Sequence, residues 1–145
     1  MRSWAQILEE SLAIPDEGDR MNKEELKQRT KRFALCIFRL VESLPRGRAA
    51  DIFSRQLLRS GTSVGANYRA ACRAKSIADF ISKMSTVEEE TDESIYWMEL
   101  LVEGGIVPED AIAPLVKEAG EILAITVSSI RTARARQSCK AHVLP

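Results

Sequence analysis

The chain of 145 residues is long enough to fold as one domain with its own hydrophobic core, and too short for two. Hydrophobic residues make up 45% and charged residues 29%, a composition typical of globular proteins and not of disordered ones. The 21 basic and 21 acidic residues cancel, so the net charge implies no general attraction for polyanions. No apolar run reaches the roughly 18 residues needed to cross a bilayer, so no membrane partner is expected.

Residues 1–21 are expected to form a leader that is separate from the rest of the chain. Apolar residues at helical spacing between Trp4 and Leu12 are cut short by Pro15. A flexible leader is favoured because so short a helix is marginal alone, and a short docking helix is the alternative. The natural product could also begin at Met21, which would make the leader an artefact of gene assignment.

Two long helices are predicted next. The first runs from about Asn22, a good N-cap, to Leu44, after which Pro45 forces a turn. The second runs from Ala49 to about Lys75. The apolar residues that recur at helical spacing in these two segments are Leu26, Phe33, Ile37, Leu40, Val41, Leu44, Ile52, Phe53, Leu57, Leu58, Val64, Tyr68, Ala71 and Cys72.

The middle of the second helix is made almost entirely of small residues, from Ser60 to Asn67. Gly61 and Gly65 each cost about 1 kcal/mol relative to alanine in a helix. A helix that keeps both glycines therefore needs another backbone close by. Ser63 and Asn67 are expected to form hydrogen bonds at this tight crossing rather than to take part in catalysis.

Ser76 is expected to cap a third helix, with Asp79 supplying a carboxylate as in a capping box. This helix ends at about Glu103, because Gly104 and Gly105 follow. Its apolar positions are Phe80, Ile81, Met84, Val87, Ile95, Trp97, Met98, Leu100, Leu101 and Val102.

The last helix begins at Glu109 or at Ala113 and ends near Arg134. Pro114 favours the later start or a tight opening turn, because proline is tolerated in the first turn of a helix. Residues 136–145 have no periodicity and are expected to form a mobile tail. The apolar stripe of this last helix consists of Ile112, Leu115, Ala119, Ile122, Leu123 and Ile130.

Four amphipathic segments with short connections predict an all-α fold, an up-down-up-down four-helix bundle over residues 22–135. No alternating strand pattern competes with this prediction.

The balanced net charge hides two segments of opposite sign. Residues 23–75 hold 13 Lys/Arg and 4 Asp/Glu, whereas residues 76–121 hold 2 and 12. The preferred interpretation pairs them within one chain, with Arg59 level with the acidic residues from Glu89 to Glu93, because it accounts for both patches at once.

Two other interpretations stay open. A basic helical face could bind the phosphates of RNA or DNA, with Arg55, Arg59, Arg69, Arg73 and Lys75 as the candidate residues. The two patches could instead meet between copies in a head-to-tail interface, which closes into a ring if the rotation allows. The candidate interface residues are Gly61, Gly65, Asn67, Glu88, Glu89, Asp92 and Glu93.

No catalytic, metal or cofactor site is expected. The lone histidine, His142, makes a Ser or Cys triad implausible, and no glycine-rich phosphate loop or metalloprotease motif occurs. Cys36, Cys72 and Cys139 are far apart in sequence and form no CxxC pair, so a zinc site is not indicated. Cys36 and Cys72 are interpreted as small buried hydrophobic residues. The cytoplasm is the expected compartment of the protein.

One set of motifs resembles a known family. The stretch from Ser54 to Arg69, SRQLLRSGTSVGANYR, is followed by ADFISKM from Ala78 and by the segment from Glu88 to Ile106. Together they resemble the four-helix-bundle proteins of the 23S rRNA intervening-sequence family, over most of residues 21–135. The resemblance implies a homopentameric ring with a central opening. A related protein, the accessory variability factor of diversity-generating retroelements, shares the pentameric bundle and binds nucleic acid and a reverse transcriptase.

We therefore expect a non-enzymatic, ring-forming helical scaffold associated with nucleic acid or ribosomal RNA. The alternative function is a direct RNA- or DNA-binding module that uses the basic face of the first two helices.

Overall fold

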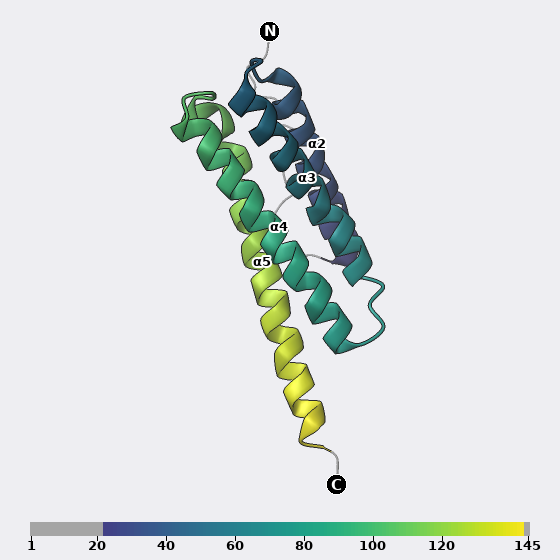
Figure 1. Ribbon diagram of the computed structural model, residues 1–145. Helices are drawn as coiled ribbons and strands as arrows, with labels where there is room; N and C mark the ends of the chain where they lie inside the picture. Colours follow the sequence, from purple (N-terminus) through teal and green to yellow (C-terminus); the bar gives the residue numbers. More distant parts are fainter. Residues whose placement is uncertain (1–21, 144–145) are drawn as a thin grey trace.

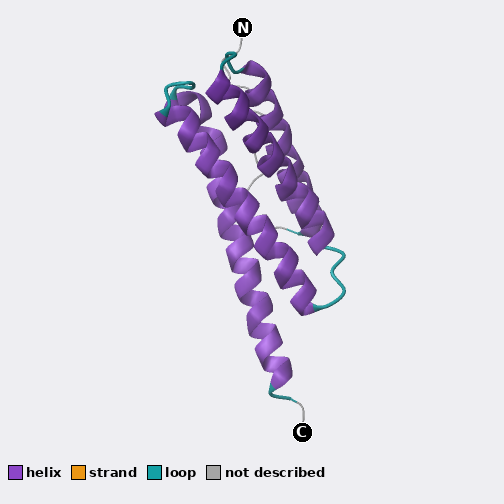
Figure 2. Cartoon of the chain, in the orientation of Figure 1, coloured by secondary structure: helices purple, strands orange, loops and turns teal. Residues whose placement is uncertain are grey.

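The structure, a computed structural model, describes residues 22–143, which form four helices and no strand. In chain order these are α2 (Lys23–Ser43), α3 (Arg48–Ala71), α4 (Ile77–Glu103) and α5 (Glu109–Ala141). The prediction of an all-α fold with four helices is confirmed, and the predicted leader lies outside the described residues. The helices lie lengthwise beside one another, and α5 reaches well past the others at one end (Figures 1 and 2).

Both predicted N-caps are confirmed. The Asn22 side chain accepts a hydrogen bond from the Glu25 N–H at 2.9 Å, and the Glu25 carboxylate accepts one from the Asn22 N–H at 3.0 Å. The Ser76 hydroxyl accepts from the Asp79 N–H at 3.0 Å, but the Asp79 carboxylate accepts from the N–H of Lys75. Each pair satisfies N–H groups that a helix start would otherwise leave free.

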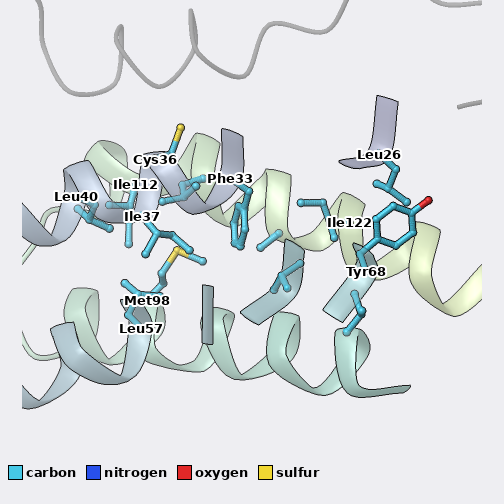
Figure 3. Packing of buried hydrophobic residues seen from close by; sticks show 14 of the residues in the cluster. Leu26, Phe33, Cys36, Ile37, Leu40, Leu57, Tyr68, Met98, Ile112 and Ile122 are labelled. Carbon is cyan, nitrogen blue, oxygen red and sulfur yellow. The ribbon is translucent and has the colours of Figure 1, made fainter. Parts of the chain in front are cut away.

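Apolar side chains from all four helices meet in a single core (Figure 3). Burying one such side chain completely contributes about 1.5–3 kcal/mol, so this cluster is the main source of stability. The predicted stripes supply it, except for Leu100 and Leu123, which are half-buried outside the cluster, and Ile52, which is 56% exposed. The largest fully buried side chains are Phe33, Ile37, Leu57, Val64, Met84, Val87, Met98, Leu101, Ile112, Leu115 and Ile122.

Helices α2 and α3 approach each other closely at the two glycines of α3. A Cβ atom at Gly61 would lie 2.2 Å from Cδ1 of Ile37, and one at Gly65 would lie 3.5 Å from the carbonyl carbon of Thr30. The close backbone is therefore present at Gly65, whereas a core side chain takes the space at Gly61. Because Ile37 meets the earlier glycine and Thr30 the later one, the two helices run in opposite directions.

Helix α3 ends at Ala71, before the predicted end near Lys75. The N–H of Arg73 bonds to the carbonyl of Ala70 at 3.0 Å, which is a tighter turn than an α-helix makes. Arg73 and Lys75 consequently lie in the connection to α4.

Helix α5 differs from its prediction at both ends. It begins at Glu109, the earlier of the two predicted starts, so Pro114 falls in its second turn. It continues to Ala141, so residues 135–141 are helical, and the prediction of an irregular tail from residue 136 is wrong for them. No helix within residues 22–143 combines the length and the apolar character needed to cross a membrane.

Candidate assembly and nucleic-acid surfaces

Arg59 connects α3 to the acidic face of α4. Its guanidinium donates to Glu90 Oε2 at 3.1 Å and also to the carboxylate of Glu93. Trp97 Nε1 donates to the same Glu93 carboxylate at 3.0 Å. These bonds, that from Arg59 foremost, hold the pKa of Glu93 below its usual value. The predicted pairing of the basic and acidic segments within one chain is therefore confirmed for Arg59.

The other arginines of the predicted basic face are not paired in this way. Arg55, Arg69 and Arg73 are exposed, and none lies within ion-pair distance of a carboxylate in residues 22–143. Arg55 borders a shallow hollow at the α2–α3 connection, together with Asp51. Lys75 is also exposed, in the connection between α3 and α4. These side chains are free to meet a partner.

The acidic residues in the middle of α4, from Glu88 to Glu93, divide into two groups. Glu90 and Glu93 are half-buried and held by Arg59. Glu89 and Asp92 are exposed, Glu88 is half-buried, and none of the three has an ion-pair partner among the described residues. Of the acidic residues predicted for an interface, Glu88, Glu89 and Asp92 are therefore the ones available to another molecule.

Gly61 is not on the outer surface, so its predicted role in an oligomer interface is corrected. It is buried against Ile37 of its own chain, and Gly65 packs against Thr30. The Asn67 amide donates to the carbonyl of Ser63 at 2.8 Å, one turn back in the same helix. The small residues thus serve the packing of α3 inside the bundle.

Sequence reasoning missed the exposed apolar side chains. Leu35 and Phe38 on α2 are 46% and 48% exposed, and Tyr96 on α4 is 52% exposed. Leu35 and Phe38 lie off the stripe that Phe33 and Ile37 define, which is the sequence signal that marks them as surface residues.

An aromatic group lies where α3 and α4 meet. The ring of Phe53 is 5.9 Å from that of Trp97, and Tyr96 meets Trp97 edge-on at 5.1 Å. Beside this group Tyr96 exposes apolar surface on α4, and Ile52, the residue before Phe53, is an exposed apolar residue on α3. The hydroxyls of Ser60 and Ser94, 2.9 Å apart, hold the same two helices together in the interior.

Among residues 22–143, no group of three or more His, Cys, Asp or Glu side chains is placed to hold a metal ion. The three cysteines are free: Cys36 is buried, Cys72 is half-buried and Cys139 is exposed.

Comparison with known proteins identifies a family and a similar solved structure. The family of 23S rRNA-intervening sequence proteins matches residues 22–128. A crystal structure of a protein of unknown function from the S23 ribosomal protein family of Bacteroides thetaiotaomicron superposes with a TM-score of 0.70 at 34% sequence identity. The match covers 75% of this chain and 97% of that one. No curated protein matches the chain.

Proposed function

Because the chain belongs to the family of 23S rRNA-intervening sequence proteins, we propose that it is a non-enzymatic scaffold. In this proposal the up-down-up-down bundle is one protomer of a ring, and the ring contains five copies, as the family resemblance implies. The observation that carries the proposal is the presence of exposed apolar residues on two unlike faces of one chain.

The first face, called the α2 face, carries Leu35 and Phe38. The second, called the α3–α4 face, carries Ile52 and Tyr96. Because the two faces differ, contact between the α2 face of one copy and the α3–α4 face of the next is heterologous. Such a contact leaves one free face at each end of a growing chain, so it ends only when the chain closes into a ring.

Charge supports the same pairing. Helix α2 holds six basic and three acidic residues, whereas α4 holds one basic and eight acidic ones. Placing α2 of one copy against α4 of the next brings opposite potentials together, which guides association and disfavours like-to-like contacts. Five acidic residues of α4 have no ion-pair partner within residues 22–143: Glu88, Glu89, Asp92, Glu99 and Glu103.

The test is the mass of the protein in solution, measured by light scattering and by native mass spectrometry at moderate salt. We expect an oligomer for the wild type, and monomers for both Phe38→Glu and Tyr96→Glu, since each variant has one disrupted face. Val143→Glu is the matched control, because Val143 is 80% exposed and lies outside both faces. A monomeric wild-type protein would remove the ring.

Mixing the two variants tests the heterologous geometry itself. Phe38→Glu keeps its α3–α4 face and Tyr96→Glu keeps its α2 face, so a mixture should form a dimer containing one copy of each. An isologous interface would give no such dimer.

The free state of all three cysteines agrees with a reducing compartment, and we include a cytoplasmic location in the proposal.

A second candidate function is direct binding of RNA or DNA. The observation that favours it is the exposure of Arg55, Arg69 and Arg73 without carboxylate partners among residues 22–143. Fluorescence anisotropy with a structured RNA and with duplex DNA tests it. Binding that weakens steeply with salt, and that is lost in an Arg69→Ala/Arg73→Ala variant, supports it. Absence of binding at low salt eliminates it.

A further inference from the structure

The C-terminal turns of α5 project past the end of the bundle (Figure 1). Ala133 is the last buried residue of this helix, and every residue from Arg134 to Val143 is exposed. An isolated helix of this length is marginal in water, but here it continues a helix that is already packed, so no new nucleus is needed. The protein therefore extends a helix into solvent where it has no contact with its own core.

The projecting segment is strongly basic. Residues 134–143 contain three Lys/Arg and no Asp/Glu, and Arg131 lies one turn before them on α5. All four cations, Arg131, Arg134, Arg136 and Lys140, are exposed, and none lies within ion-pair distance of a carboxylate in residues 22–143. Only Lys140 lies in the last turn, where a cation offsets the helix dipole. Stabilisation of the helix end thus accounts for one of the four charges.

The composition of this segment excludes two of its possible uses. Between Arg131 and Ala141 the chain contains no Leu, Ile, Phe, Met, Val or Trp. A helix that inserts into a membrane surface needs a large apolar face opposite its basic one, and so does a helix that docks in a protein groove. A helix that is basic or polar all round instead suits a partner that presents only charge and hydrogen-bond acceptors.

The connection between α3 and α4 lies at this same end of the molecule (Figure 1). It carries Arg73, and the last turn of α3 carries Arg69. The connection between α4 and α5, at the other end, is flanked by Glu103, Glu109 and Asp110. The end where α5 projects therefore carries Arg69, Arg73 and the cations of α5, whereas the other end carries these three acidic residues together with Arg46 of the α2–α3 connection and Arg48 at the start of α3.

We propose that the projecting end of α5 binds the phosphate backbone of double-helical nucleic acid through Arg131, Arg134, Arg136 and Lys140. At 1.5 Å per residue these side chains span about 14 Å of helix. Over that length a duplex carries about eight phosphate charges, enough to engage all four cations. This inference rests on the nucleic-acid candidate of the proposed function and assigns the main contact to a helix that the candidate does not include.

The experiment measures fluorescence anisotropy of the full chain with labelled duplex RNA and duplex DNA over a range of salt concentrations. The test variant is Arg134→Gln/Arg136→Gln, which alters both sides of the helix because the residues are two apart. Glutamine keeps the helix propensity close to that of arginine. The matched control is Arg46→Gln/Arg48→Gln, an equal loss of exposed charge at the opposite end. Circular dichroism confirms equal helix content.

We expect the test variant to bind about fivefold more weakly or worse at 50 mM salt, and the control to bind as the wild type does. The slope of log K against log salt is negative, and each lost phosphate contact makes it less steep by about 0.9. The magnitude of the slope should therefore decrease by about 1–2 in the test variant alone. Binding to either duplex that is weakened in the test variant and not in the control supports the proposal, and the duplex that is bound identifies the source of the phosphates.

Three results would overturn the assignment to α5. The first is an equal loss of affinity in the test and control variants. The second is binding that depends on Arg69 and Arg73 but not on Arg134 and Arg136, which leaves the second candidate function standing. The third is binding to phosphatidylserine vesicles but to neither duplex, which identifies a membrane surface instead. No binding of the wild type to either duplex removes both nucleic-acid proposals.

Discussion

Arg29 of α2 and Glu118 of α5 form a buried ion pair that joins two helices with few other contacts. Arg29 Nη2 donates to Glu118 Oε2 at 2.9 Å, and both side chains are only 6% exposed. Arg29 also pairs with Glu121, one turn later on α5. The hydrogen bond with Glu118 raises the pKa of Arg29 against the effect of burial, so the guanidinium stays charged in the interior. Helices α2 and α5 are thus aligned by charge.

Removing one partner of this pair should destabilise the fold strongly. Glu118→Leu takes one carboxylate away from the buried Arg29 guanidinium, so we expect a loss of about 3 kcal/mol in the free energy of unfolding. Urea denaturation followed by circular dichroism measures it. The double variant Arg29→Met/Glu118→Leu replaces the pair by apolar side chains and should recover most of the loss. A single variant whose free energy of unfolding lies within about 0.5 kcal/mol of the wild-type value, the error of such data, would contradict the prediction.

Alanine should have opposite effects at two glycines. At Gly61 its Cβ would lie 2.2 Å from Ile37 Cδ1, and Ile37 is fully buried, so we expect a net loss of about 1–3 kcal/mol. At Gly120 the Cβ would meet no atom within 4 Å, so better helix propensity should add about 1 kcal/mol. Thermal unfolding of the two variants checks both signs. Gly61→Ala/Ile37→Val should recover part of the loss, because valine lacks Cδ1.

The elements of the fold follow from local signals in the sequence. Asn22 and Ser76 could be recognised in advance as caps, because a cap has a defined hydrogen-bonding role. The close packing at the two glycines of α3 could also be recognised, because such glycines require a close neighbour. The end of α5 could not, because residues 135–141 carry no apolar periodicity and remain helical by continuing a packed helix. The Arg29–Glu118 pair, 89 residues apart in sequence, depends on the tertiary arrangement and has no local signature.

Acid should weaken the Arg59–Glu93 contact. The folded state holds the pKa of Glu93 below its ordinary value of 4.5, chiefly through the bond from Arg59. The contact therefore stabilises the fold at pH values above 4.5, and its contribution is lost as the pH falls through the lower pKa of the folded state. Because Arg59 is about half exposed, the effect should not exceed about 0.5 kcal/mol.

The variant Glu93→Gln isolates that contribution. Its urea midpoint should differ from that of the wild type at pH 7 and converge with it once the pH is below the pKa of Glu93 in the folded state, as measured by denaturant titration at both pH values. Glu89→Gln is the matched control, because Glu89 is exposed and has no ion-pair partner among the described residues. A difference for Glu93→Gln that is the same at both pH values would show that the charge is not responsible.

Cys36 and Cys139 should differ sharply in their reactivity toward thiol reagents. Burial raises the pKa of the Cys36 thiol and excludes reagents, whereas Cys139 is exposed on the projecting end of α5. Since the thiolate is the reactive form, Ellman's reagent should modify Cys139 rapidly and Cys36 only after unfolding. The Cys139→Ser variant should lose the fast phase. A fast phase that persists in this variant and disappears in Cys36→Ser would contradict the placement of Cys36.

The candidate surfaces were predictable only in part. The pairing of Arg59 with the acidic run could be anticipated because α3 and α4 form a hairpin that brings the two segments level. Phe38 and Tyr96 were missed as surface residues because apolar type alone does not separate a core position from an exposed one. For Phe38 the position off the Phe33–Ile37 stripe was the available signal, and its exposed fraction follows from the placement of the neighbouring helices.

The projection of α5 gives the molecule a direction. Rotation about a single axis closes a ring without turning any copy over, so every α5 end in such a ring would emerge on the same side. The assembled particle would then have a front, ringed with cationic helices, and a back without them. A long polyanion would approach such a particle from one side only, leaving the other side open to a different partner.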